Sequence, residues 1–162
     1  MPIISMIAAM AKNRVIGDGK GMPWKLSKEM AYFKKTTMGK PLILGRKTFQ
    51  TFGEKPLLGR PHIIVTRNKN YAPKGVQVAH SVEEALTLAK TLTIDEIMVI
   101  GGAEIYNQAL KFCTRIYLTE IDVEAGGEIL FPEFNKAIFK EVSRKHESEE
   151  NINYDFVIYE KE

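Results

Sequence analysis

The chain has 162 residues and a mass of 18.3 kDa, with 44% hydrophobic residues, 27% charged residues and a formal net charge of +3. This composition excludes intrinsic disorder and predicts a single domain over residues 1–162, within which about 40–90 would form a sub-lobe. The basic residues are scattered among acidic ones, so we expect neither nucleic acid nor a membrane as a partner.

The single cysteine, Cys113, excludes an intramolecular disulfide and is typical of a reducing compartment, so we expect a cytoplasmic protein. The apolar residues 1–11 follow no basic leader and are too few to span a bilayer, and we expect a buried strand there. Other short apolar runs are typical of strands that are covered on both faces. Strands are predicted at Ile3–Ala9, Leu42–Leu44, Ile63–Val65, Ile97–Ile100, Ile116–Leu118 and Phe156–Tyr159.

Helical periodicity lies between these runs. Two apolar stripes have helical spacing: Leu26, Met30, Phe33 and Thr37, and then Val82, Ala85, Leu86 and Ala89. Ser81 is a predicted N-cap of the second stripe, and Ala103–Leu110 predicts a third, short helix. Strands that alternate with helices indicate an α/β fold with a mostly parallel central sheet.

The C-terminal part has strand-like segments without helices between them. They are Arg115–Asp122, Phe139–His146 and Tyr154–Glu160, with a polar turn over 147–153. The sheet is therefore expected to end in an antiparallel hairpin. The loops 12–22 and 124–132 are long and contain glycine, which is typical of functional segments, and the first is expected to close over the site and gate turnover.

Several catalytic motifs are absent from the sequence. It contains no Walker A pattern and no GxSxG elbow, and its three histidines are far apart. Hydrolase chemistry and metal binding are therefore disfavoured, and no metal site is expected.

Three predicted strands end in residues suited to phosphate binding. The segments are Gly45–Thr48, Thr66–Arg67 and Gly101–Ala103, and in a parallel sheet they meet at one edge. Glycine lets the backbone approach a phosphate, and a following helix offers free N–H groups. For any one segment a plain structural explanation suffices, in which glycines end strands and arginines cover surface. The three together favour a dinucleotide, and two arginines favour NADP over NAD.

Glu29 lies on the same helical face as Leu26 and Phe33. Desolvation in a dry cleft would raise its pKa, and such a carboxyl group can hold a protonatable heterocycle. Alternatively, Glu29 only favours the helix dipole in a first turn that Ser27 caps. The segment Met22-Pro23-Trp24 is either a core anchor of the preceding loop or the hinge of a lid beside the site.

The order and spacing of these motifs resemble bacterial dihydrofolate reductases over almost the whole chain. The matching segments are Ile7–Ala9, Asn13–Gly17, Met22–Trp24, Phe33–Lys34, Gly45–Phe49, Gly59–Arg60, Ile100–Tyr106, Tyr117–Thr119 and Phe131–Pro132. The resemblance implies an eight-stranded sheet and a monomer. It also implies a reaction in which NADPH gives hydride to C6 of 7,8-dihydrofolate and N5 is protonated.

The resemblance also implies roles for individual residues. The catalytic group would be Glu29, Met22, Trp24, Tyr106 and Thr119, with Glu29 as the only active-site acid and Thr119 in the hydrogen-bond network behind it. The substrate and antifolates would contact Ile7, Ala8, Glu29, Phe33, Phe52, Leu57, Arg60, Ile100 and Thr119. NADPH would contact Ala9, Ile16, Gly17, Gly45, Arg46, Lys47, Thr48, Thr66, Arg67, Ile100, Gly101, Gly102, Ala103, Glu104, Ile105, Tyr106 and Gln108. The Gly101–Gly102 peptide would be cis.

The sequence departs from the family pattern at the acid, because bacterial chromosomal members usually carry Asp where this chain has Glu29. Two other functions stay open from the sequence. One is a pyrimidine reductase of riboflavin synthesis with the same fold, against which Glu29 and Arg60 together favour the folate. The other is a non-catalytic basic binding module, which gives no reason for an acid in an apolar stripe.

Overall fold

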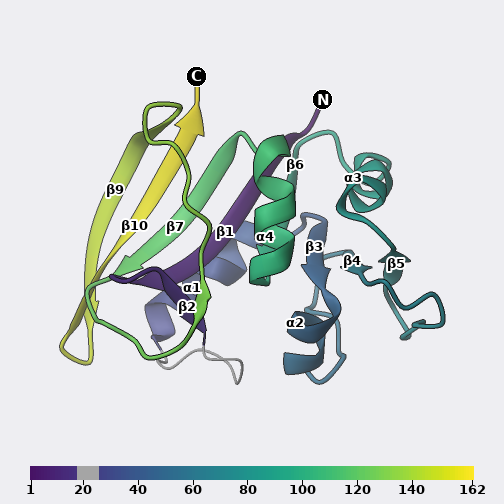
Figure 1. Ribbon diagram of the computed structural model, residues 1–162, viewed down its shortest axis with the longest axis horizontal. Helices are drawn as coiled ribbons and strands as arrows, with labels where there is room; N and C mark the ends of the chain where they lie inside the picture. The colour runs from purple at the N-terminus through teal and green to yellow at the C-terminus, as the bar shows by residue number, and fades with distance from the viewer. Residues whose placement is uncertain (18–25) are drawn as a thin grey trace.

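A computed structural model describes residues 1–17 and 26–162 of the protein. Its centre is an eight-stranded sheet in the order β5-β4-β3-β6-β1-β7-β10-β9, with helices on both faces (Figure 1). The predicted α/β fold with a mostly parallel sheet and a C-terminal antiparallel hairpin is confirmed. Met22, Trp24 and most of the loop expected over 12–22 lie outside the described residues.

Six strands of this sheet run parallel. They are β1 (Ile3–Ala11), β3 (Leu42–Gly45), β4 (His62–Val65), β5 (Gln77–Ala79), β6 (Glu96–Gly101) and β7 (Arg115–Ile121). Two further strands, β9 (Phe139–Glu149) and β10 (Ile152–Lys161), pair antiparallel at the C-terminal edge. Every residue of β6 is buried, because helices cover both of its faces, and this explains its continuous apolar sequence.

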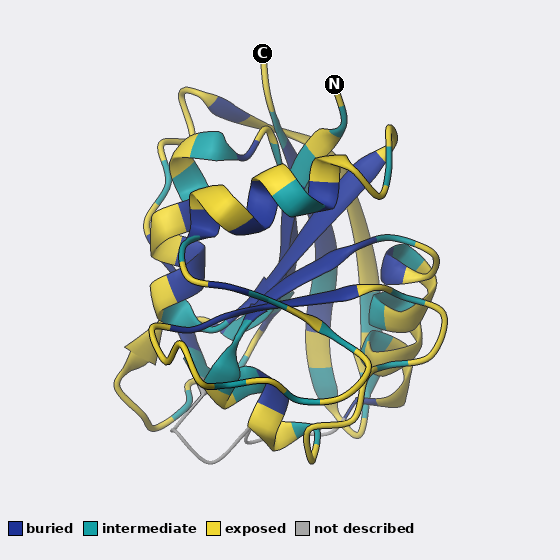
Figure 2. Ribbon diagram, turned by 90° about the vertical axis from the view of Figure 1, so that its right-hand side faces the viewer, coloured by how far each residue is buried: buried dark blue, intermediate teal, exposed yellow. Residues whose placement is uncertain are grey.

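Four α-helices pack on the sheet: α1 (Ser27–Thr37), α2 (Arg46–Thr51), α3 (Val82–Lys90) and α4 (Ala103–Ala109), followed by the 3-10 turn η1 (Leu110–Phe112). The predicted N-cap is confirmed, since Ser81 Oγ accepts a 3.0 Å hydrogen bond from the backbone N–H of Glu84. In Figure 2 the buried strands run through the middle of the molecule, and the helices on both sides turn exposed faces outward. No helix within 1–17 and 26–162 is long and apolar enough to cross a membrane.

The prediction of helix α1 is right in extent and wrong in two details. Met30 is 60% exposed, whereas Leu26 and Thr37 are buried. The buried face therefore follows Leu26, Glu29, Phe33 and Thr37, and Met30 lies beside it because it is one residue off this stripe. The N-cap is Leu26 and not Ser27, so the first turn receives its acceptor from elsewhere in the chain.

Three short strands were not predicted. They are β5 and the pair β2 (Val15–Gly17) and β8 (Ile129–Leu130), which form a separate two-stranded sheet. Their pairing connects the loops that were expected over 12–22 and 124–132. Arg14 adds two hydrogen bonds between these loops, because its Nε and Nη2 donate to the carbonyl oxygen of Phe131 at 3.1 and 2.9 Å.

The polar turn predicted over 147–153 is much shorter in the structure. β9 continues to Glu149 and β10 begins at Ile152, so only Glu150 and Asn151 form the turn. Both have positive φ, 53° and 63°, which is the backbone of a two-residue type I′ turn. β9 lies at the edge of the sheet, and its residues 140–146 are exposed.

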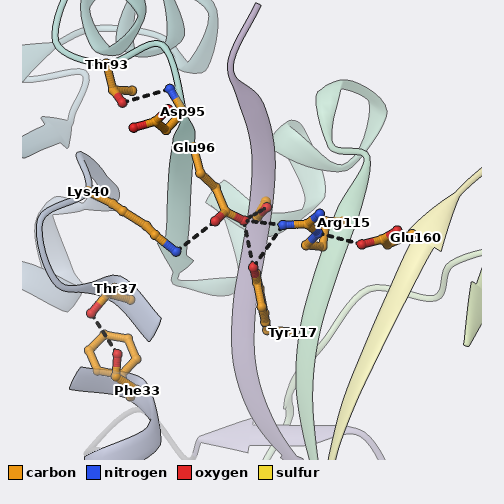
Figure 3. A network of polar contacts seen from close by, with 10 residues as sticks. Phe33, Thr37, Lys40, Thr93, Asp95, Glu96, Arg115, Tyr117 and Glu160 are labelled. Atoms are coloured by element: carbon orange, nitrogen blue, oxygen red, sulfur yellow. Dashed lines mark hydrogen bonds and ion pairs between the residues drawn. The ribbon is translucent and has the colours of Figure 1, made fainter. Parts of the chain in front are cut away.

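A buried polar cluster joins the amino ends of the strands (Figure 3). Its centre is Glu96, whose carboxylate accepts hydrogen bonds from Ser5 Oγ at 2.6 Å, Lys40 Nζ at 2.7 Å and the Tyr117 hydroxyl at 2.8 Å. Arg115 lies 3.3 Å from the same carboxylate. This cluster lies at the end of the sheet opposite to the one where the functional residues were predicted, and its charges are paired and hydrogen-bonded, as burial requires.

Candidate active site

The predicted site residues gather at the carboxyl edge of the parallel strands. β3 ends at Gly45 and β6 ends at Gly101, and the register places Leu44 opposite Gly101. The peptide between Gly101 and Gly102 is cis, as the resemblance implied. Gly101 has a φ of +113°, and a Cβ there would lie 3.0 Å from the ring of Tyr106, so the close packing of α4 on this edge requires glycine.

Glu29 is the acid of this edge. It lies in the first turn of α1 on the face turned toward the sheet, and desolvation by burial raises its pKa from 4.5 to about 7. Burial raises the pKa of Tyr106 as well, and the charge of Glu29 adds to this effect across 77 positions of sequence. The charge of Glu29 is thus felt at the start of α4, and the burial of the acid agrees with the dry environment that its position on the apolar stripe predicted.

Apolar side chains predicted to hold the substrate form one cluster on the α1 face of the sheet. Ile7 and Ile100 are buried there, and Phe33, Phe52 and Leu57 pack against the same cluster. Ala8 is different, because alternate residues of a strand face opposite sides of the sheet. Its methyl group packs into the cluster beneath α3 and α4, on the face opposite to Ile7, so its predicted contact with the substrate stays a prediction for its backbone.

Arg60 follows the loop that carries Leu57 and is held by two hydrogen bonds. Its Nη1 donates to Thr37 Oγ1 of α1 at 3.0 Å, and its Nε donates to the carbonyl oxygen of Leu58 at 3.0 Å. A guanidinium group has further N–H donors, and their fork geometry suits a carboxylate.

His62 is a functional candidate that the sequence did not single out. It is buried, its Nε2 lies 3.0 Å from the backbone nitrogen of Leu57, and its Nδ1 lies 2.8 Å from the carbonyl oxygen of Arg60. Since the Leu57 N–H can only donate and the Arg60 carbonyl can only accept, the ring is neutral and carries its proton on Nδ1. His62 thus braces the loop between Leu57 and Arg60. The sequence signals this contact only through the spacing of five residues between Leu57 and His62.

Several residues predicted to bind the cofactor lie where β3 and β6 end and helices α2 and α4 begin. The N-cap residues of α2 and α4 are Gly45 and Gly102, so no N-cap side chain covers the first N–H groups of either helix. A Cβ on Gly45 would lie 3.2 Å from Cγ1 of Ile105, so glycine also allows α2 and α4 to approach each other. Together with the cationic side chains of Arg46 and Lys47, this edge fits a dinucleotide phosphate.

Arg67 and Glu104 form an ion pair with a distance of 2.7 Å at this side of the site. Gln108 Nε2 donates to the same carboxylate oxygen at 3.2 Å. Thr66 is buried, and its hydroxyl accepts a hydrogen bond from the backbone N–H of Asn68. The structure thus joins Arg67, Glu104 and Gln108 of the predicted cofactor residues, and the charge of Glu104 opposes an anionic ligand at Arg67.

Other predicted residues also lie near the edge. Thr119 is buried in β7, in register with Ala9 of β1 and Phe156 of β10. Ile16 and Gly17 belong to the short strand β2, and Thr48 lies in α2, where its Oγ1 would be 3.4 Å from a Cβ on Gly102. The described residues contain no group of three or more histidine, cysteine or acidic side chains that could hold a metal ion.

Comparison with known proteins decides the family. The family model of dihydrofolate reductase matches residues 3–161. The chain belongs to the dihydrofolate reductase family. It is 39% identical over 158 residues to the dihydrofolate reductase of Neisseria meningitidis serogroup A, with 96% of each chain covered. It is 41% identical over 161 residues to that of Staphylococcus haemolyticus, which covers 98% of this chain and 95% of the relative.

A solved structure agrees with this assignment. The dihydrofolate reductase from Enterococcus faecalis complexed with NADP(H) and RAB-propyl has a TM-score of 0.91 and 30% sequence identity, with 98% of this chain and 96% of that chain covered. The activity of the chain is therefore that of a dihydrofolate reductase, and the expected reductase is confirmed. The pyrimidine reductase and the non-catalytic binding module, left open by the sequence, are not supported.

Proposed function

We propose that this enzyme transfers hydride from NADPH to C6 of 7,8-dihydrofolate, with Glu29 promoting the addition of a proton at N5. One observation carries the proposal: an acid lies in the first turn of α1, on the helix whose Phe33 packs against the apolar cluster of Ile7 and Ile100, and burial there raises its pKa to about 7. Hydride and proton together give 5,6,7,8-tetrahydrofolate and NADP⁺, so the atoms and charges balance.

Glu29 performs two tasks in this reaction. Its carboxyl oxygens hold the 2-amino group and a ring nitrogen of the pterin by paired hydrogen bonds. Its raised pKa keeps a large share of the free enzyme protonated near neutral pH, which favours the delivery of a proton to N5 through water. The desolvated surroundings strengthen both effects, because electrostatic interactions are stronger where water is excluded.

Residues around Gly101 hold the cofactor. NADPH supplies the hydride when it is bound. Arg46, Arg67 and Thr66 bind the 2′-phosphate, whereas Lys47, Thr48 and the backbone N–H groups of 102–105 bind the pyrophosphate. Further contacts come from Ala9, Ile16, Gly17, Gly45, Ile100, Tyr106 and Gln108.

The apolar cleft binds the rest of the substrate. Phe33, Phe52 and Leu57 surround the aminobenzoyl group, and Arg60 pairs with the α-carboxylate of the glutamate tail. Antifolates occupy the same cleft, because they present a similar heterocycle to Glu29. We also propose that the enzyme acts as a monomer in the cytoplasm, where its single buried cysteine stays reduced.

The test combines a substrate panel with one variant. NADPH oxidation is followed with dihydrofolate and, separately, with the pyrimidine intermediate of riboflavin synthesis, and only dihydrofolate is expected to react. Glu29→Gln is expected to slow hydride transfer by about 100-fold or more while the Kd for NADPH changes little. Glu83→Gln, an exposed acid in the first turn of α3, is the matched control. Equal losses in hydride transfer and NADPH binding would contradict the assignment of Glu29.

A further inference from the structure

Helix α1 begins without a capping side chain of its own, because its N-cap residue is Leu26. Its first two backbone N–H groups instead donate to a carboxylate from the opposite end of the chain. Ser27 N–H donates to Oε1 of Glu149 with an N···O distance of 2.7 Å, and Lys28 N–H donates to Oε2 with 3.1 Å. Two of the four unpaired donors of this helix end are thereby satisfied by one side chain.

The β9–β10 hairpin fixes the position of Glu149. It is the last residue of β9 and pairs with Ile152 across the two-residue turn of Glu150 and Asn151. The hydroxyl of the buried Tyr154 donates to Oε2 of Glu149 at 3.3 Å. The hydrogen bonds from the backbone of Lys28 and Ser27 hold the pKa of Glu149 below its ordinary value, so this carboxylate is ionised at neutral pH.

Glu29 lies between two contacts that α1 makes with this hairpin. Lys28, one residue earlier, is bonded to Glu149 through its backbone. Tyr32, almost one turn later, stacks on Phe156 of β10 with a centroid distance of 4.1 Å and an interplanar angle of 19°. Figure 1 shows the hairpin tip and α1 at the same lower end of the molecule. These two contacts therefore fix where the helical turn that carries Glu29 lies along the hairpin, and which side of that turn faces β10.

We propose that Glu149 is a positioning residue, which seats the first turn of α1 on the β9–β10 hairpin and thereby places the carboxyl group of Glu29 at the substrate. This inference rests on the proposed role of Glu29. Glu149 itself lies on the hairpin and acts through the backbone of α1. The neighbouring acid, Glu147, has another role, because it pairs with the side chain of Lys28 at 3.2 Å and not with the helix backbone.

Three variants test the contact. In Glu149→Ala, the amide hydrogens of Ser27 and Lys28 are expected to exchange about threefold to thirtyfold faster, as for the loss of a helix cap. Hydride transfer is expected to slow by a similar factor, while the Kd for NADPH stays within about twofold of wild type. Glu149→Gln is expected to change amide exchange and hydride transfer less than Glu149→Ala does, because its amide oxygen still accepts a hydrogen bond. Glu147→Gln is the control and is expected to change neither.

Ser27→Pro removes one donor without removing Glu149. Proline suits the first helical position, and Leu26 before it has φ −122° and ψ 110°, which a residue preceding proline prefers. In this background Glu149→Ala is expected to slow hydride transfer less than in wild type, because one of the two bonds is already absent.

Two results would overturn the proposal. One is unchanged exchange of both amides in Glu149→Ala, which would show that the contact does not hold the helix. The other is faster exchange together with wild-type hydride transfer, which would show a cap without influence on Glu29. Failure of the proposed function is distinguishable from both, since it would appear as an unimpaired Glu29→Gln enzyme, whereas amide exchange reports on Glu149 alone.

Discussion

The hydroxyl of Tyr106 donates a 2.6 Å hydrogen bond to the carbonyl oxygen of Ile7 and so connects α4 to β1. The parallel ladder between β1 and β6 reaches only to Met6 and Val99, so the carbonyl of Ile7 is the next one beyond it. The phenol takes the place that a backbone N–H of the neighbouring strand would occupy. β1 and β6 therefore stop pairing at this edge without leaving the buried carbonyl of Ile7 unpaired.

Tyr106→Phe is expected to lower the free energy of unfolding by about 1–3 kcal/mol, because the buried carbonyl of Ile7 loses its partner. Urea denaturation measures this loss. Tyr71→Phe makes the same change where the hydroxyl donates to the exposed Glu54, and there a loss below about 0.5 kcal/mol is expected. Equal losses in the two variants would show that the Ile7 contact has no special weight.

Glu29→Gln is expected to stabilise the protein at alkaline pH. The folded pKa of about 7 lies above the ordinary 4.5, so the native state binds this proton more tightly than the unfolded state does. The free energy of unfolding therefore falls as the pH rises from about 4.5 to about 7, and the variant avoids this fall. We expect it to be about 1–3 kcal/mol more stable than wild type near pH 8 and similar near pH 4. The prediction would be contradicted if the difference in free energy of unfolding between the variant and wild type were the same at about pH 4 and about pH 8.

Arg67→Glu is expected to weaken NADPH binding by about 1–3 kcal/mol and to affect NADH little, because only NADPH carries a 2′-phosphate. Glu104→Gln tests the same contact from the other side. Since Glu104 holds Arg67 at 2.7 Å, removal of its charge is expected to tighten NADPH relative to NADH. Titration of cofactor fluorescence gives the affinities of wild type and of both variants for NADPH and for NADH. Equal changes for both cofactors would rule out the 2′-phosphate role.

Glu96→Gln is expected to lower the free energy of unfolding by about 2–4 kcal/mol, because it leaves Lys40 and Arg115 without a full counter-charge. Desolvation raises the pKa of Glu96, but hydrogen bonds from Lys40, Ser5 and Tyr117 outweigh it, and the net pKa is lowered. Its stabilisation is therefore present above the ordinary pKa and lost as the pH falls through the folded pKa. Acid titrations of wild type and variant should converge at low pH. Glu160→Gln, which removes a partner of Arg115 that is more exposed than Glu96, is the control and should cost less than about 1 kcal/mol.

His62→Gln is expected to raise the KM for dihydrofolate and to leave the Kd for NADPH unchanged, because the ring braces Leu57 and Arg60. Burial lowers the pKa of His62, so the unfolded state takes up its proton first, and the stabilisation from this group declines as the pH falls below about 6.5. NMR titration of the imidazole nitrogens measures this pKa and the tautomer. His62→Asn retains only a donor toward Arg60 and separates the two contacts. A freely titrating ring, or an altered NADPH affinity, would argue against the brace.

The sequence predicted those features that depend on local pattern. The buried strands β3, β4 and β6 are continuous apolar runs, and helix α3 has both a periodic stripe and a capping serine. Glu29 was found because its spacing from Leu26 and Phe33 put an acid on an apolar helical face. Periodicity could not show that Met30 lies just outside that face, since this depends on how the helix is rotated on the sheet.

Features that depend on distant contacts were missed. β2 and β8 are too short to have a pattern of their own, and they form because segments more than 110 residues apart pair with each other. The carboxylate that replaces Ser27 as the cap of α1 lies 122 residues away in sequence. His62 likewise has no motif, because its role depends on the fold of the loop that it supports.

The two outer strands of the sheet differ in length and are protected in different ways. β5 has only three residues, too few to pair with a strand of another molecule. β9 is long, but it exposes Lys140, Glu141, Arg144 and Lys145 to solvent. Such charges oppose the docking of a foreign strand along this rim and so disfavour sheets that run from one molecule to the next.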